Sequence, residues 1–313
     1  MGEMMFQWTC CLAQTRQLNH RLKKSTVALL SLATSLLISV GGSFPAFSAT
    51  TDNPVFFQIN YQGEQAYLLG SIHVGKDDFY PLNHTIEHAF SASDALVIEA
   101  DMAKADVPAL LQEYGKASPK VSEQTQQVLS DFCPKNAQLC TAIAPFAPWL
   151  QASQIGLVRF GQLGLRADKG VDLTFVANKG DKPLYQLESV AFQFKLLSSF
   201  STQTQLDMVK EAIKVSDSEM KGLINAWRSG DEKQLSMLMD DPESMSAEVI
   251  EKLLLQRNHS MAAGIETLMM KHKGEQLFIV VGAGHLVGRQ SVPSLLQSTG
   301  MTVKKCHQQQ CGE

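Results

Sequence analysis

The sequence predicts an α/β fold in which a mixed central sheet, built from two related halves, has flanking helices and a helical middle region. Near the start of the folded part, apolar runs of β-forming residues enclose a segment with helical spacing, an order typical of parallel or mixed sheets. Further apolar runs follow near the other end of the chain. One run in each half leads into the pattern Gly-x-x-His, at Gly70–His73 and Gly282–His285, which relates the two halves.

In the first half, residues 55–59 and 66–69 are predicted to be paired strands, because β-formers flank a Gln-Gly-Glu turn at residues 62–64. Residues 82–92 place apolar side chains at helical spacing. Residues 95–98 are all apolar, which indicates a buried strand. The order strand, strand, helix, strand is therefore expected here.

The middle of the chain, from residue 107 to about residue 160, has helical patterns that break at prolines. Long helical patterns also occupy residues 192–273. We expect the middle helices to form an insertion between the two sheet-bearing halves. The remaining predicted elements are a helix at residues 171–178, a strand at 184–187, a strand at 277–281, a helix at 292–298 and a strand at 301–303.

The charge of the chain argues against a nucleic-acid partner. Its formal net charge is −4, charged residues make up 19%, and no basic stripe is present. Beyond the N-terminal segment, no apolar stretch approaches the roughly 18 residues of a membrane helix. No stable membrane span is therefore expected after processing, and a homo-oligomer stays open.

The N-terminal segment has the order of a secretory signal peptide. The basic cluster Arg21–Lys24 precedes an apolar stretch at residues 25–40, and small residues follow up to residue 49. Cleavage is expected after Ser48 or Ala49. We therefore divide the chain into a signal peptide and N-terminal extension (1–49) and a single domain (50–313), with a periplasmic or secreted location. An uncleaved anchor is the alternative.

Four of the six cysteines lie in the predicted domain, as two close pairs. Cys133 stands near Cys140, and Cys306 stands near Cys311. In an exported protein this spacing favours two disulfides that each close a short loop. Buried thiols or a metal cluster are the alternatives, although these spacings match structural zinc sites poorly.

Polar side chains end the predicted strands of both halves. Histidines with one or two carboxylates suit a divalent metal ion, which supplies Lewis acidity and an activated water. Nitrogen and oxygen ligands without thiolate fit manganese, cobalt or zinc. The alternatives are ordinary core or turn histidines, and carboxylates that cap a helix or face solvent. The residues concerned are His73, Glu99, Asp101, Glu188 and His285.

A competing motif, His-x-x-Glu-His, is formed by His84, Glu87 and His88 and matches the inverted zinc-protease signature. In a helix, the apolar residues of this segment cover one side, and the two histidines point to the other. We therefore expect solvated histidines here. A zinc protease centred on this pair stays the less favoured alternative.

Six short motifs resemble, in their order along the chain, those of the TraB/GumN family, which includes the Tiki metalloproteases of animals. The resemblance covers about residues 55–303. Residue 171 is valine where many relatives have methionine, but the following Asp172 is kept. The motifs are Tyr67–Gly75, Ala95–Asp101, Val171–Phe175, Leu187–Gln193, Arg257–Asn258 and Val281–Gly288.

The resemblance implies roles for individual residues. It implies that His73, His285 and Glu99 are metal ligands or catalytic groups, with Glu99 a ligand or the general base. Arg257 is a catalytic candidate that binds a substrate carboxylate or an oxyanion. The remaining matched residues, which would support catalysis or substrate binding, are Glu188, Gln193, Asn258 and Asp172.

The resemblance also implies a mixed α/β fold akin to the erythromycin-esterase and ChaN-like superfamily. Metal-dependent peptide hydrolysis is the activity of the Tiki branch. The sequence therefore predicts an exported metal-dependent hydrolase, a peptidase acting on a peptide or protein substrate. The alternative is a non-catalytic binding or scaffold protein of the cell envelope with a degenerate site.

Overall fold

The computed structural model describes residues 52–239, 245–306 and 311. The predicted signal peptide and both cleavage positions lie outside these ranges. Within them, no helix combines the length and the apolarity that crossing a lipid bilayer requires.

The centre of the fold is a six-stranded mixed sheet in the order β4-β3-β5-β2-β1-β6. Strands β4, β3, β5 and β2 run parallel to one another, whereas β1 is antiparallel to both β2 and β6. The strands are β1 (Phe56–Tyr61), β2 (Glu64–Ser71), β3 (Ala95–Ile98), β4 (Leu184–Gln186), β5 (Leu277–Gly282) and β6 (Thr302–Lys305).

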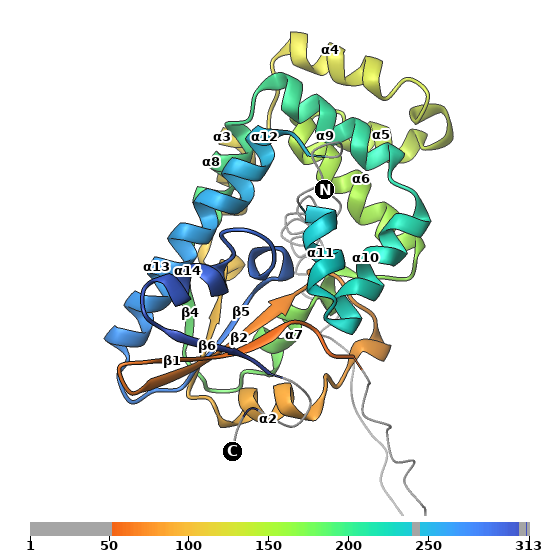
Figure 1. The fold of residues 1–313 in the computed structure, drawn as a ribbon. Helices are drawn as coiled ribbons and strands as arrows, with labels where there is room; N and C mark the ends of the chain where they lie inside the picture. Colours follow the sequence, from red (N-terminus) through yellow and green to blue (C-terminus); the bar gives the residue numbers. More distant parts are fainter. Residues whose placement is uncertain (1–51, 240–244, 307–310, 312–313) are drawn as a thin grey trace, which may run out of the picture.

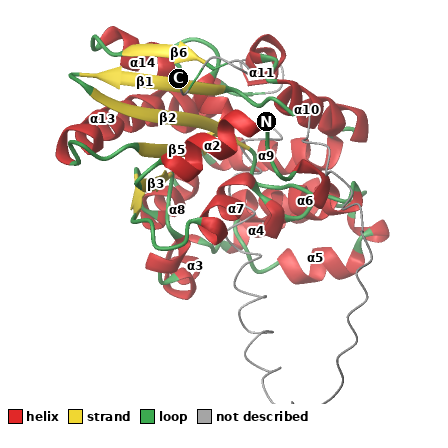
Figure 2. Cartoon of the chain, turned by 90° about the horizontal axis from the view of Figure 1, so that it is seen from below, coloured by secondary structure: helices red, strands yellow, loops and turns green. Residues whose placement is uncertain are grey.

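Helices cover both faces of this sheet, and a larger group lies beyond one end of it. Helices α2 (His84–Ala92) and α7 (Val171–Asn178) lie on one face, while α13 (Gln256–Lys271) and α14 (Val292–Ser298) lie on the other (Figures 1 and 2). The helices of the middle region gather beyond the carboxyl end of β2 (Figure 1). The α/β class, the mixed sheet and the helical middle region are thus confirmed.

Several helices of the middle region begin with a proline in the first turn or a serine at the N-cap. Pro119 and Pro148 occupy the first turns of α4 and α6, where a missing N–H costs nothing. The pattern predicted over residues 192–273 divides into several helices with serine N-caps. The helices are α3 (Val107–Tyr114), α4 (Pro119–Val128), α5 (Ala137–Ile143), α6 (Pro148–Gln162), α8 (Val190–Ser198), α9 (Thr202–Lys214), α10 (Asp217–Ser229), α11 (Glu232–Met239) and α12 (Ala247–Val249).

The two central parallel strands are buried along their whole length, as expected where helices cover both faces. Every residue of β3 and β5 is buried. The Phe278 ring of β5 contacts Phe56, Phe90 and Phe175, with ring centroids 5.0 to 6.1 Å apart. This core holds the carboxyl ends of the strands in fixed positions.

Both predicted cysteine pairs lie at disulfide distance. The sulfur atoms of Cys133 and Cys140 are 2.03 Å apart, and those of Cys306 and Cys311 are 2.06 Å apart. The first pair joins the turn Cys133–Lys135 to α5, and the second lies just after β6. The two pairs join residues seven and five positions apart in the sequence.

Two glycines let the segment after β2 approach the segment before α7. The backbones of Gly75 and Arg166 exchange hydrogen bonds of 3.0 and 2.8 Å, and the Val171 N–H donates to the Ile72 carbonyl at 2.9 Å. A Cβ built on Gly75 would lie 2.1 Å from the Lys169 carbonyl oxygen, and one built on Gly170 would lie 2.6 Å from the His73 carbonyl oxygen. Only glycine permits this approach without moving the backbone.

We predict that Gly75→Ala and Gly170→Ala each lower the free energy of unfolding by about 1–3 kcal/mol, the usual range for overpacking. Gly156→Ala, in α6, is the matched control. No atom lies within 4 Å of a Cβ built on Gly156, so this change is expected to be neutral or to stabilise by up to about 1 kcal/mol. Urea unfolding measures all three, and equal effects at the three positions would contradict the close approach.

Candidate functional site

The polar groups predicted at the strand ends converge at one edge of the sheet. His73 follows β2, Glu99 follows β3 directly and Glu188 follows β4, while His285 lies in the 3₁₀ turn Ala283–Leu286 after β5. Because these four strands are parallel neighbours, their carboxyl ends meet, and that edge is where α/β proteins place ligand sites. All four side chains are buried, with His285 completely so.

The two imidazoles are each held through Nδ1. His73 Nδ1 lies 2.8 Å from Asp172 Oδ1, and His285 Nδ1 lies 2.6 Å from Asn258 Oδ1. A carboxylate can only accept, so His73 carries its proton on Nδ1. In each neutral ring the lone pair is therefore on Nε2.

The amide of Asn258 is oriented by a backbone carbonyl, which settles the tautomer of His285. Asn258 Nδ2 donates to the Gln290 carbonyl oxygen at 2.9 Å, and a carbonyl accepts only from the NH₂ end of an amide. Oδ1 must then face His285, and the ring must donate from Nδ1. Gln290 has φ of 52°, a left-handed conformation that is uncommon for residues other than glycine.

The His285 ring is kept neutral. Burial, with help from the nearby Arg257 charge, lowers its pKa from 6.5 to about 3, although Glu99 opposes this shift. Its Nε2 lies 3.8 Å from Glu99 Oε1 and has no hydrogen-bond partner among the residues that the structure describes. At neutral pH this contact is therefore no ion pair, and Nε2 presents a buried lone pair.

Glu99 is ionised and has both oxygens engaged. Oε2 accepts from Arg257 Nη2 at 2.6 Å, and Oε1 accepts from the Gly282 N–H at 2.7 Å. Burial alone would raise the pKa of Glu99, but Arg257, the two histidines and this N–H together hold it at about 2. A carboxylate this acidic is a poor proton acceptor near neutral pH.

Arg257 ties two strand ends together. Its guanidinium is 1% exposed, and Nε and Nη2 each lie 2.9 Å from an oxygen of Glu188. Gln193 Nε2 donates to the same carboxylate at 2.9 Å. Formal charges of −1 on Glu99, −1 on Glu188 and +1 on Arg257 sum to −1, and a further carboxylate, that of the partly exposed Asp172, lies beside His73. The buried cluster is thus short of positive charge.

Arg257 and Asn258 reach their partners because they are neighbours in the first turn of α13. A π-helical segment, Ile250–Leu255, leads into this helix, and such segments are frequent at functional sites. Consecutive helical residues point about 100° apart, so one side chain meets the two carboxylates while the next meets His285. This explains why the pair occurs as a dipeptide.

The cluster fits a divalent cation in donor type and in charge. Two ligands about 2.1 Å from one ion in tetrahedral geometry lie about 3.4 Å apart, and the distance from His285 Nε2 to Glu99 Oε1 is 3.8 Å. Within the described residues, however, no group of three or more His, Cys, Asp or Glu side chains is arranged to hold a metal. Glu99 instead turns to Arg257 and Gly282.

The other residues of interest lie outside the cluster. Asp101 caps the turn Met102–Lys104, with Oδ1 accepting from the Ala103 N–H at 3.0 Å. Of the two roles considered for this carboxylate, metal ligand and helix cap, it has the second. His84 and His88 are exposed on α2, so the expectation of solvated histidines is confirmed. The Gln290 carbonyl was not foreseen, because no local pattern marks a residue with positive φ unless it is glycine or asparagine.

We predict that Arg257→Met destabilises the protein by about 3–5 kcal/mol at neutral pH, because two buried carboxylates lose their counter-charge. Without Arg257, burial raises the pKa of the Glu99 carboxyl, so the loss is smaller in acid, where this group is protonated. The control is Arg159→Met, whose partner Asp217 is 64% exposed, with an expected loss below about 1 kcal/mol. Urea unfolding near pH 7 and near pH 5 measures the loss of stability for both variants. A loss for Arg257→Met near pH 7 no larger than that for Arg159→Met would refute the buried cluster.

We also predict that acid destabilises the metal-free protein through His285. The unfolded chain takes up a proton near pH 6.5, but the folded chain does so only near the lowered pKa of about 3. Stability therefore falls as the pH drops below 6.5, by up to about 1.4 kcal/mol per pH unit from this group. His285→Asn is expected to flatten the profile, whereas His84→Asn leaves it unchanged. Unfolding in urea with a chelator present gives the slopes, and parallel profiles for all three proteins would rule out this assignment.

Comparison with known proteins places the chain in a family. The sequence pattern of the TraB/PrgY/gumN family matches residues 55–305, and the chain belongs to this family. The uncharacterized protein YbaP of Shigella flexneri is 25% identical over 74% of this chain and 88% of its own length. YbaP of Escherichia coli K12 is also 25% identical, over 74% and 87%. An uncharacterized protein of Treponema pallidum is 19% identical over 86% of each chain. No solved structure matches the chain.

Proposed function

We propose that this member of the TraB/PrgY/gumN family is a metal-dependent hydrolase that cleaves peptide bonds. The observation that carries the proposal is the pair of imidazoles at neighbouring strand ends. Each ring is anchored through Nδ1, so that Nε2 bears the lone pair. Anchoring of this kind, through a carboxylate or an amide, is what metal-binding histidines receive from their surroundings.

The charge of the cluster supports a cation as the bound group. Two carboxylates face one guanidinium in a buried space, and a third carboxylate holds His73. A manganese, cobalt or zinc ion held by His73, His285 and Glu99 would balance this charge, supply Lewis acidity and lower the pKa of a bound water. Glu99 would have to exchange its Arg257 or Gly282 contact to take part.

The two histidines are suited to different tasks. His285 is neutral, completely buried and paired with an amide, so it donates a lone pair and does not carry protons at neutral pH. His73 is paired with the carboxylate of Asp172, which stabilises an imidazolium. His73 has one lone pair, on Nε2, so it can either ligate the ion or take a proton from the attacking water. In the second role it is better suited than Glu99, whose pKa is about 2.

Arg257 is better suited to hold the site together than to bind substrate. Its Nε and Nη2 are used by Glu188 and Glu99, and the side chain is almost completely buried. Binding a substrate carboxylate or an oxyanion would require one of these ion pairs to open. Glu188 and Gln193 act with it as a positioning layer.

We also propose that the protein acts outside the cytoplasm, in the periplasm or as a secreted protein, on the strength of the N-terminal segment. The paired cysteines fit an oxidising compartment. The substrate is then a peptide or an envelope protein that is accessible there.

One observation favours a second function, that of a binding protein without turnover. Glu99 is closed onto Arg257 and Gly282, and the described residues contain no ready cluster of three metal ligands. A protein of this kind would hold no stoichiometric metal. Elemental analysis of the protein purified with each candidate metal separates the two functions.

We predict that His73→Ala and His285→Ala each abolish hydrolysis while the circular dichroism spectrum is kept. Cleavage of a peptide library is measured with added manganese, cobalt or zinc, and with a chelator. His84→Ala and His88→Ala are the matched controls, because both histidines are exposed on α2, and they should retain full activity. Full turnover by both metal-loaded site variants would exclude the proposed hydrolytic centre.

A further inference from the structure

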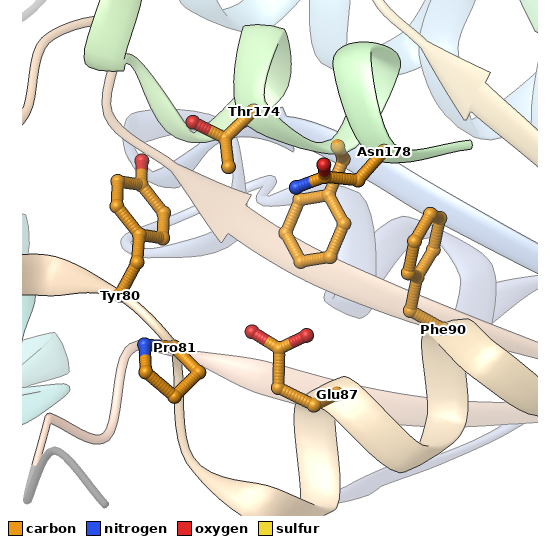
Figure 3. Close-up of a pocket in the computed structure, with 7 residues that line it drawn as sticks. Tyr80, Pro81, Glu87, Phe90, Thr174 and Asn178 are labelled. Atoms are coloured by element: carbon orange, nitrogen blue, oxygen red, sulfur yellow. The ribbon is translucent and has the colours of Figure 1, made fainter. Parts of the chain in front are cut away.

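A cavity of about 280 Å³ lies between α2 and α7. None of its lining residues belongs to the histidine cluster, by which we mean His73, His285, Glu99, Glu188 and Arg257 with their partners Asp172, Gln193 and Asn258. Figure 3 shows Glu87 and Phe90 of α2 on one side and Thr174 and Asn178 of α7 on the other. Tyr80 and Pro81 close one end of it. Its volume is near the lower end of the roughly 300–1,000 Å³ of small-molecule sites, so it would take a small ligand.

The carboxylate of Glu87 is directed into this cavity (Figure 3). Oε1 accepts from the Leu82 N–H at 2.8 Å, which fixes the side chain across the start of α2. Burial raises the pKa of Glu87, and this hydrogen bond opposes the shift only in part. Glu87 is thus a partly desolvated carboxylate that a cation would stabilise.

The remaining walls supply aromatic rings and neutral polar side chains but no cation. Phe90 and Phe175 pack edge to face, with ring centroids 4.7 Å apart. Across the cavity from Glu87 lie the side chains of Thr174 and Asn178. Among the seven lining residues Glu87 is the charged one. A carboxylate beside aromatic rings favours a positively charged ligand with an apolar part.

Lys182 lies near the Phe90 ring, but its ammonium group is bound elsewhere. Its Nζ lies 5.7 Å from the Phe90 ring centroid and donates to the carbonyl oxygens of Ser91 and Ser93. It does not line the cavity, and it is not among the groups that shift the pKa of Glu87. Among the described residues that line the cavity, none supplies a counter-charge to this carboxylate.

We propose that this cavity binds a small organic cation, whose ammonium group pairs with Glu87 while its apolar part lies against Phe90 and Phe175. The glutamate of the His-x-x-Glu-His pattern thus faces a ligand site while the two histidines face solvent. The proposal does not depend on the hydrolytic function, because none of the lining residues belongs to the histidine cluster.

The test uses benzylammonium as the probe and benzyl alcohol as its neutral counterpart, titrated into the purified protein by isothermal calorimetry near pH 7.5. Saturable binding of benzylammonium is expected, at least about tenfold tighter than binding of the alcohol, a difference of about 1.4 kcal/mol. Glu87→Gln keeps an oxygen for the Leu82 N–H but removes the charge, so it should lose at least about tenfold in benzylammonium affinity. Glu123→Gln on α4, at the far end of the molecule (Figure 1), should bind as the unaltered protein does.

Three outcomes would overturn the proposal: no saturable binding, equal binding of the two probes, or an unchanged affinity in Glu87→Gln. If Glu87→Gln fails to fold, Thr174→Val and the chemical shifts of the Thr174 and Asn178 amides replace it. Benzylammonium should then shift both amides, and the absence of such shifts at saturation would locate the probe elsewhere and refute the site. Neither result bears on peptide cleavage, so failure here is distinguishable from failure of the hydrolytic proposal.

Discussion

The candidate site depends on one buried guanidinium. Arg257 stays charged at any physiological pH, so its burial requires carboxylates around it. Those carboxylates are Glu99 after β3 and Glu188 after β4, so this one side chain sets the position of α13 against the sheet. The neighbouring Asn258 then meets His285 after β5. A single helical turn thereby aligns three strand ends.

The repeated Gly-x-x-His pattern does not produce two equivalent histidines. His73 shares a proton with a carboxylate, and His285 shares one with an amide. A carboxylate stabilises a protonated ring, whereas a neutral amide does so much less. Together with complete burial, this keeps His285 uncharged. Similar backbone positions at neighbouring strands can therefore carry different chemistry, because the partner is supplied by a distant part of the chain.

Much of the fold, and the placing of polar residues at its strand ends, could be predicted from local patterns. The predicted bounds of β3, α7 and α14 agree with the structure, since buried apolar runs and helical spacing are properties of neighbouring residues. The pairing of Glu99 with Arg257 was not predictable, because residues far apart in sequence decide which group neutralises a buried carboxylate. The same is true of Gly170 beside the His73 carbonyl and of Gln290 beside Asn258. Those contacts depend on the approach of two backbones, and no sequence pattern in either segment indicates that approach.

The strand order also has a consequence for how the protein is made. β5 lies between β2 and β3, although both of those strands are synthesised long before it. The sheet cannot close, and the four strand ends cannot meet, until β5 has left the ribosome. Contacts between such remote segments form slowly, so the sheet and the polar groups at its strand ends assemble late. If the protein is exported, this delay gives the secretion machinery an unfolded chain to thread and leaves no assembled centre on the wrong side of the membrane.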